Sequence, residues 1–357
     1  MVSSLRGTIQ MVSKGIRPDR APLPWQRLAI SMAAAVFVTT ACSGQAATQS
    51  AAATATSGPS VAPTTGAAQS SSISPLPLPG GRLVYIALNE EGVGSLVATN
   101  PEGTNTTVLL PAGNPPRWSP DGRHIAVVAD TAQGRLFVSL VDPDGSNYVQ
   151  FDNPDPTLEL DCQAWSPDGL RLACSGFDGT DVTRNGIYTV RSSDGGDLTR
   201  VTTSPDGGHD AASDYSPDGQ QIVFTREGIE DEADRTLMIV NVDGSGARAL
   251  SDRPLGRGRW SPDGKTILSD LGEEGESLVL VPVDGGEIRA IEIDSDTLKS
   301  AFGGSWSPDG KWIVFSGRAT MSVDLWIVRV DGTNLHQVTD TPMGQWEEAA
   351  DWAAAAP

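Results

Sequence analysis

The pentapeptide Trp-Ser-Pro-Asp-Gly recurs along this chain of 357 residues at an almost constant interval. Its copies begin at Trp118, Trp165, Trp260 and Trp306, and a variant led by tyrosine begins at Tyr215. The successive steps are 47, 50, 45 and 46 residues. A period of this length, with several short strands in each repeat, is typical of a propeller or a solenoid.

A single repeat predicts four short strands, which we call A to D. In the turn after Trp165, proline presets the first backbone angle, aspartate suits the second position and Gly169 takes the left-handed one. We therefore expect a three-residue hairpin loop with Ser166 opposite Leu170. The A strand ends at Trp165, and strands B, C and D are expected at 171–175, 186–190 and 198–202. Four antiparallel strands of this length make one propeller blade.

The two ends of the repeat region complement each other. The region begins with B, C and D strands only, expected at 82–87, 95–99 and 106–110. At the other end Trp352 follows Trp306 by 46 residues and marks one further A strand. This strand can complete the first blade and leave no free sheet edge at the join. The sequence therefore predicts an all-β, six-bladed β-propeller over residues 81–357, with its first blade closed by the C-terminal strand.

The repeats resemble the WD-repeat-like Pro-Asp family found in TolB-like periplasmic propellers, and the resemblance extends from about Pro79 to Trp352. It implies a six-bladed fold and a role in binding other envelope proteins. Similar repeats form the gating propeller of prolyl-oligopeptidase-like enzymes and the body of some pectate-degrading lyases. The chain departs from TolB because no α/β domain is recognisable ahead of the repeats, so the TolB partner is not carried over.

The N-terminal segment has the pattern of a bacterial lipoprotein leader. Residues 1–27 carry five basic residues and one acidic residue, and residues 28–41 are uncharged. An apolar core of 14 residues is too short to span a bilayer and suits a secretory signal. Thr39-Thr40-Ala41-Cys42 resembles a lipobox, although Thr39 stands where an aliphatic residue is usual. We expect a signal peptide over 1–41 and a lipid on Cys42; the alternative is cleavage near Ala46 and Ala47 without lipidation.

Composition supports an extracytoplasmic location and excludes one class of partner. Residues 42–80 are almost entirely small and polar, and predict a flexible tether to a membrane in the periplasm or at the cell surface. The formal net charge is −20, and removing the five positive charges and one negative charge of residues 1–41 leaves about −24. An acidic surface repels nucleic acid. We expect a monomer that contacts the membrane through its lipid only.

The two remaining cysteines flank one Ser-Pro-Asp-Gly hairpin. If Ser166 faces Leu170, the register places Cys162 and Cys174 directly opposite each other. A disulfide is then feasible in an oxidising compartment. The alternative is two buried thiols. Either state is structural.

The sequence carries no recognisable catalytic or metal-binding signature. Its three histidines, His124, His209 and His336, fall in different predicted blades. The chain has no Gly-x-Ser-x-Gly elbow and no phosphate loop. Turn chemistry alone explains the repeated aspartates. We therefore predict no enzyme, no metal site and no cofactor; a cation such as calcium at the channel mouth is the alternative.

The irregular loops provide the candidate binding surface. We call the end of the propeller with the B–C and D–A loops the loop face, and the end with the Asp-Gly turns the turn face. Loops on a rigid scaffold are where binding usually resides. The candidate residues are Glu159, Asp161, Asp210, Asp214, Arg253, Arg257, Arg259, Glu273, Glu274, Glu276, Glu347, Glu348 and Asp351.

These observations favour a protein- or peptide-binding module that acts through the acidic loop face on an envelope partner. The alternatives are a carbohydrate-active lyase or hydrolase that uses the central channel, and a propeller that binds a cation or small ligand. An enzyme would need His209, Asp210, Asp214 and Glu348 to converge on one point.

Overall fold

The computed structural model describes residues 78–354 except 113, 131–135, 206–207, 229–234, 273–276 and 320. The predicted signal peptide, Cys42 and nearly all of the predicted tether lie outside these residues. Glu273, Glu274 and Glu276 lie outside them as well. No helix within the described part of the chain is long and apolar enough to cross a membrane.

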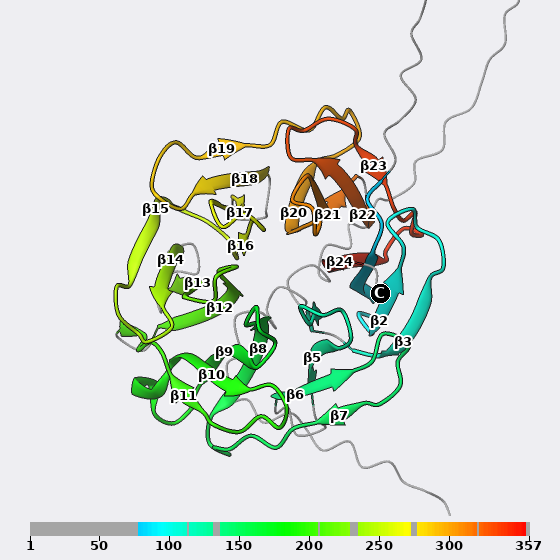
Figure 1. Cartoon of the computed structure of the whole chain (residues 1–357). Helices are drawn as coiled ribbons and strands as arrows, with labels where there is room; N and C mark the ends of the chain where they lie inside the picture. Colours follow the sequence, from blue (N-terminus) through cyan, green and yellow to red (C-terminus); the bar gives the residue numbers. More distant parts are fainter. Residues whose placement is uncertain are drawn as a thin grey trace, which may run out of the picture. The chain divides into compact units, whose positions relative to one another are not determined.

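The described residues form a β-propeller, as the repeats predict (Figure 1). Four sheets have four antiparallel strands each, and a 3₁₀ helix at Val182–Arg184 is the one helical element described. The sheets are β4 (Arg117–Trp118), β5 (Ile125–Asp130), β6 (Leu136–Val141) and β7 (Val149–Gln150); β8 (Glu159–Trp165), β9 (Arg171–Phe177), β10 (Gly186–Arg191) and β11 (Thr199–Arg200); β12 (His209–Tyr215), β13 (Gln221–Glu227), β14 (Arg235–Asn241) and β15 (Arg248–Pro254); and β16 (Arg259–Trp260), β17 (Thr266–Leu271), β18 (Ser277–Pro282) and β19 (Arg289–Ala290).

The remaining strands form one eight-stranded sheet that contains both ends of the described chain. It combines β20 (Ser300–Trp306), β21 (Trp312–Arg318), β22 (Val323–Arg329) and β23 (His336–Gln337) with β24 (Trp346–Ala353), β1 (Arg82–Leu88), β2 (Gly94–Thr99) and β3 (Thr107–Pro111). Strand β24 pairs antiparallel with β1, with Leu83 opposite Trp352. It meets β22 through a single parallel pair, Val323 with Trp346. The C-terminal strand therefore pairs with the first strand.

The innermost strands contact one another in a closed cycle of β24, β4, β8, β12, β16, β20 and β24 again. Figure 1 shows β8, β12, β16, β20 and β24 around the centre, with the outer strands β7, β11, β15 and β19 at the rim. Apolar side chains fill the space between neighbouring sheets. Ile187 packs with Phe224 between one pair of sheets, and Leu280 packs with Phe315 between another. Each sheet is thus held on both faces by its neighbours.

A side-chain network explains why the Ser-Pro-Asp-Gly turn recurs. In one copy the Ser166 hydroxyl donates to Asp168 Oδ1 at 2.6 Å and accepts from the Arg171 N–H at 2.9 Å. The same carboxylate oxygen accepts the Leu170 N–H at 3.0 Å. These bonds hold the pKa of Asp168 below its ordinary value. The other four copies repeat the network at Ser119, Ser216, Ser261 and Ser307.

The turn is one residue longer than the pattern predicts. The Ser166 N–H donates to the carbonyl of Arg171, so Ser166 faces Arg171. The predicted pairing of Ser166 with Leu170 is therefore wrong. Because Asp168 accepts the Leu170 N–H within the turn, Leu170 does not join the strand.

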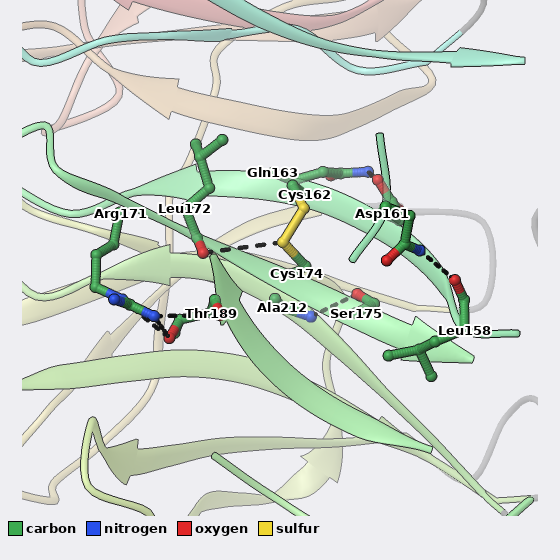
Figure 2. The surroundings of a disulfide bond; sticks show 11 residues. Leu158, Asp161, Cys162, Gln163, Arg171, Leu172, Cys174, Ser175, Thr189 and Ala212 are labelled. Atoms are coloured by element: carbon green, nitrogen blue, oxygen red, sulfur yellow. Dashed lines mark hydrogen bonds between the residues drawn. A yellow bond between two sulfur atoms is a disulfide. The ribbon is translucent and has the colours of Figure 1, made fainter. Parts of the chain in front are cut away.

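A bulge next to the hairpin restores the register of the cysteines. The pairing shifts by one residue between Cys162 and Ala164, so that Cys162 faces Cys174. The two sulfur atoms are joined in a disulfide between β8 and β9 (Figure 2). The bridge is buried.

One buried carboxylate lies at the join between β24 and β1. Glu347 faces Ala87 in the strand pair and is 7% exposed. Burial raises the pKa of its carboxyl to about 7, although hydrogen bonds from Thr339 and Tyr85 oppose the rise. Oε2 has no partner among the described residues. The charged form of Glu347 therefore weakens the join, whereas the protonated form does not.

We expect the substitution Glu347→Gln to change how stability depends on pH. A carboxyl group whose folded-state pKa is raised from 4.5 to about 7 contributes stability that is fully present below pH 4.5 and is lost as the pH rises through 7. The free energy of unfolding of E347Q relative to the natural chain should therefore improve by about 2 kcal/mol between pH 5 and pH 8. Urea unfolding at both pH values measures this difference. The exposed Glu102→Gln serves as control, and an E347Q difference that stays constant with pH would contradict the assignment.

Candidate functional site

A cavity of about 310 Å³ lies on the propeller axis at the end of the inner strands nearest the turns. Its walls are the last residues of the inner strands and the serines and prolines of the turns that follow them. Five tryptophans complete the lining, namely Trp118, Trp165, Trp260 and Trp306 of the repeated motif and Trp352 of the closing strand. The repeat thus builds both the scaffold and the cavity.

One residue of each inner strand, the one preceding the repeated aromatic residue, sets the polarity of this cavity. Around the cycle these residues are Asp351, Arg117, Ala164, Asp214, Arg259 and Ser305. The order is acidic, basic, small, and then again acidic, basic, small. Residues with the same charge therefore occupy opposite positions in the cycle.

Both aspartates accept hydrogen bonds from donors on the inner strands. Asp351 accepts the backbone N–H of Trp118 at 2.8 Å and the Ser305 hydroxyl at 2.9 Å. Asp214 accepts the backbone N–H groups of Trp260 at 2.9 Å and Tyr215 at 3.0 Å. Burial raises the pKa of Asp214 to about 7 despite these bonds. The aspartates thus tie β24 to its neighbours β4 and β20, and β12 to its neighbour β16.

The two arginines have few partners. Arg117 and Arg259 are each 8% exposed. Arg117 donates to the carbonyl of Pro116 at 2.7 Å, and its Nε is buried with no partner among the described residues. Arg259 donates to the carbonyl of Ser213. Within the described chain neither guanidinium has a carboxylate within 4.0 Å, and burial lowers the pKa of Arg117.

A second polar layer bounds the cavity on the loop side. Arg257 reaches past β12 to donate to Gln163 Oε1 on β8. Gln163 Nε2 donates to both carboxylate oxygens of Asp161, at 2.9 and 2.8 Å. Arg257 also lies 3.8 Å from Asp161. Since Gln163 lines the cavity, this cross-channel link separates the cavity from the loop face.

The structure divides the predicted site residues into several groups. Asp214, Arg259 and Asp351 line the cavity, and Asp161 and Arg257 form the layer above it. Glu347 belongs to the join between β24 and β1, whereas Glu348 is partly buried with a pKa raised by burial.

The other predicted residues lie elsewhere. Asp210 is fully buried and bound by Arg226, with Nε 2.7 Å from Oδ1, and by the Thr202 hydroxyl at 2.6 Å. Arg253 is exposed at the end of β15, and Glu159 begins β8. The carboxylate of Asp210 is committed to these partners, and burial lowers the pKa of its neighbour His209.

Sequence reasoning missed Arg117, Gln163 and Ser305. Each lies one or two residues before a repeated aromatic residue, so superimposing the repeats on one another would have identified them. It also missed exposed carboxylates of the loop face at Glu90, Glu91, Asp294, Asp296 and Asp340.

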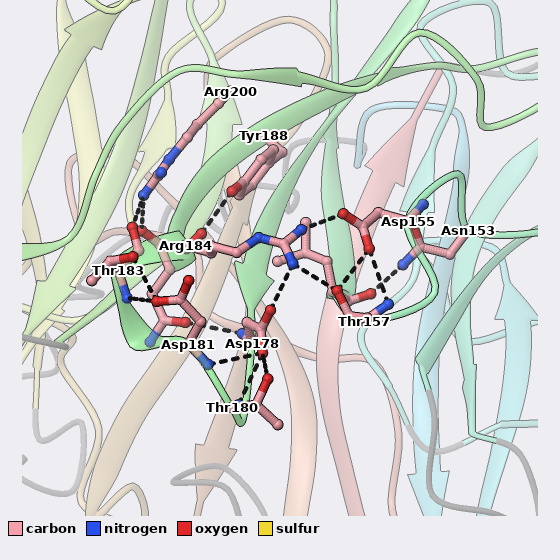
Figure 3. Close-up of polar contacts among 12 residues, drawn as sticks. Asn153, Asp155, Thr157, Asp178, Thr180, Asp181, Thr183, Arg184, Tyr188 and Arg200 are labelled. Atoms are coloured by element: carbon pink, nitrogen blue, oxygen red, sulfur yellow. Dashed lines mark hydrogen bonds and ion pairs between the residues drawn. The ribbon is translucent and has the colours of Figure 1, made fainter.

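A network of ion pairs orders part of the loop face. Arg184 pairs with Asp178 at 2.8 Å and with Asp155, which come from different loops of the sheet β8–β11 (Figure 3). Its Nη1 also donates to the Thr157 hydroxyl at 2.6 Å. The D–A loop before β8 and the B–C loop after β9 are therefore linked. No group of three or more His, Cys, Asp or Glu residues in the described ranges is arranged to hold a metal ion.

Comparison with known proteins identifies the family. Two relatives are the uncharacterized peptidase YuxL of Bacillus subtilis, 32% identical over 150 residues, and the Tol-Pal system protein TolB of Francisella tularensis, 27% identical over 194 residues. The alignments cover 31% and 52% of this chain but only 22% and 42% of those relatives, so the chain spans less than half the length of either.

A solved structure shows the same fold. TolB from Acinetobacter baumannii superimposes with a TM-score of 0.60 at 21% identity, over 77% of this chain and 67% of that one. A family model described as the TolB beta propeller domain matches residues 78–355. The chain therefore belongs to the TolB beta-propeller domain family.

Proposed function

We propose that this chain is an extracytoplasmic, six-bladed propeller, anchored by a lipid on Cys42, that binds an envelope protein or peptide through its acidic loop face. The count of six rests on the eight-stranded sheet, which counts as two blades joined by the single pair Val323 with Trp346. The leader pattern, the small-residue tether and the acidic composition support the location. Membership of the TolB propeller family supports a protein partner.

The observation that carries the binding proposal is the distribution of charge on the loop face. Glu90, Asp294 and Asp340 are exposed there and lie in three different loops. By contrast, Arg184 and Arg226 are held in ion pairs with Asp178 and Asp210, although Arg253 is exposed. The described part of the face therefore presents an excess of exposed negative charge, which suits a basic partner segment.

The described residues support the enzyme alternative less well than the binding module. It requires Asp210, Asp214, Glu348 and His209 to converge, and Asp210 is bound by Arg226 whereas Asp214 lies in the axial cavity. The peptidase name of one relative applies to a protein of which this chain matches 22%. The axial cavity separately supports a small-ligand function.

We expect capture of an envelope partner by the full-length chain to depend on loop-face charge. The variant Glu90→Gln, Asp294→Asn, Asp340→Asn should capture at least about threefold less partner, because it removes three charges that steer and orient a basic segment. Raising the salt concentration should weaken capture by the natural chain, since exposed charges are screened. Quantitative mass spectrometry of cross-linked complexes measures both effects.

A charge-matched variant on the turn face provides the control. Glu102→Gln, Asp284→Asn, Glu287→Gln also removes three exposed charges and should capture like the natural chain. Equal losses of capture in both triple variants would show an effect of net charge and would contradict the loop-face assignment. Undiminished capture by the loop-face variant would place the partner elsewhere.

The anchor has its own test. The natural chain should incorporate labelled fatty acid in a bacterial host and sediment with membranes, whereas Cys42→Ser should do neither, because only a cysteine can form the thioether link to lipid. N-terminal sequencing of the released form distinguishes the alternatives. A natural chain that is soluble and begins near Ala46 or Ala47 would show simple cleavage instead.

A further inference from the structure

The axial cavity holds two buried positive charges without direct counterions. Arg117 and Arg259 come from β4 and β16, at opposite positions of the inner cycle. Both line the cavity and both are more than nine-tenths buried. A guanidinium has five N–H donors and stays protonated in proteins. Each of these two donates to one carbonyl oxygen among the described residues, at Pro116 and Ser213.

The two carboxylates of the cavity attract Arg117 electrostatically, but within the described chain they make no direct ion pair with either arginine. Asp351 and Asp214 already accept two hydrogen bonds each from strand and serine donors. Neither arginine comes within 4.0 Å of a carboxylate in the described chain, in contrast to Arg226 and Arg184, which do. Burying a charge without a close partner is costly. Their unused donors therefore favour a negatively charged ligand in the cavity.

We propose that the axial cavity is a binding site for a small oxyanion held between the guanidinium groups of Arg117 and Arg259. A planar guanidinium matches two oxygen atoms of a carboxylate or phosphate with two parallel hydrogen bonds. Two such groups at opposite positions suit an anion with oxygen atoms on more than one side, such as phosphate or a small dicarboxylate. The site is distinct from the acidic loop face because the link between Arg257 and Gln163 lies between them.

The dimensions and the local charge agree with this ligand class. A volume of about 310 Å³ corresponds to roughly ten water molecules, which is enough for phosphate or malonate but not for an oligosaccharide. The two aspartates oppose an anion electrostatically. Burial raises the pKa of Asp214 to about 7, so part of its population is neutral near pH 7 and the repulsion is reduced.

Calorimetry on the full-length chain tests the proposal with sodium phosphate and sodium malonate as probes. Sodium chloride at the same ionic strength is the reference. We expect saturable binding of at least one probe, weakened by about tenfold or more in Arg117→Lys and in Arg259→Lys, because lysine keeps the charge but loses the two-point geometry. Arg248→Lys changes an exposed arginine of the outer strand β15, outside the cavity, and should bind like the natural chain.

A second readout does not depend on the variants folding. Five tryptophans line the cavity, so saturation of the natural chain should change its tryptophan fluorescence with the same midpoint as the heat. Absence of saturable binding for both probes would overturn the proposal. Binding without a fluorescence change, or binding that survives in both Arg117→Lys and Arg259→Lys, would show an adventitious surface site and would overturn it as well.

Discussion

The pairing of β24 with β1 is the interaction on which the rest of this structure depends. It joins residues 346–353 to residues 82–88, the two ends of the repeat region, within one sheet. Without it, β1 would present an unpaired edge, and the apolar cluster that packs Trp352 against Leu83, Val314 and Leu325 would be open on one side. The closed cycle of inner strands, and therefore the axial cavity, exists only if this join holds. A long-range pairing of this kind has to offset the entropy lost when a long loop is closed.

Closure of the ring also brings residues from distant parts of the chain together at the axis. Because each inner strand ends at or next to an aromatic residue at the same point of the repeat, the residue before it occupies an equivalent position in each strand. The axis is thereby surrounded by Asp351, Arg117, Ala164, Asp214, Arg259 and Ser305, drawn from across the repeat region. A change at one of these positions alters the cavity while leaving the turn network of the adjacent serine intact.

The sequence predicted the fold well because the repeat encodes local structure. The positions of the strands around Trp165 and Trp306, and the role of Trp352 in a closing strand, follow from turn chemistry and spacing. The predicted turn was one residue too short, since the bond from the Leu170 N–H to Asp168 depends on side-chain geometry. The candidate site was less predictable. Whether Asp210 is free depends on the register that brings Arg226 opposite it, and whether Glu347 is buried depends on the join.

Hydrogen exchange of the native protein is the most direct test of ring closure as the governing constraint. If closure holds the propeller together, amides of Trp346–Ala353 and Arg82–Leu88 should exchange as slowly as those of the internal strand Arg171–Phe177, because all of them open only by global unfolding. Mass spectrometry of peptides from these three strands gives the comparison. Exchange at residues 346–353 that is faster by about tenfold or more, while residues 171–177 stay protected, would show that the join opens locally and would contradict the account.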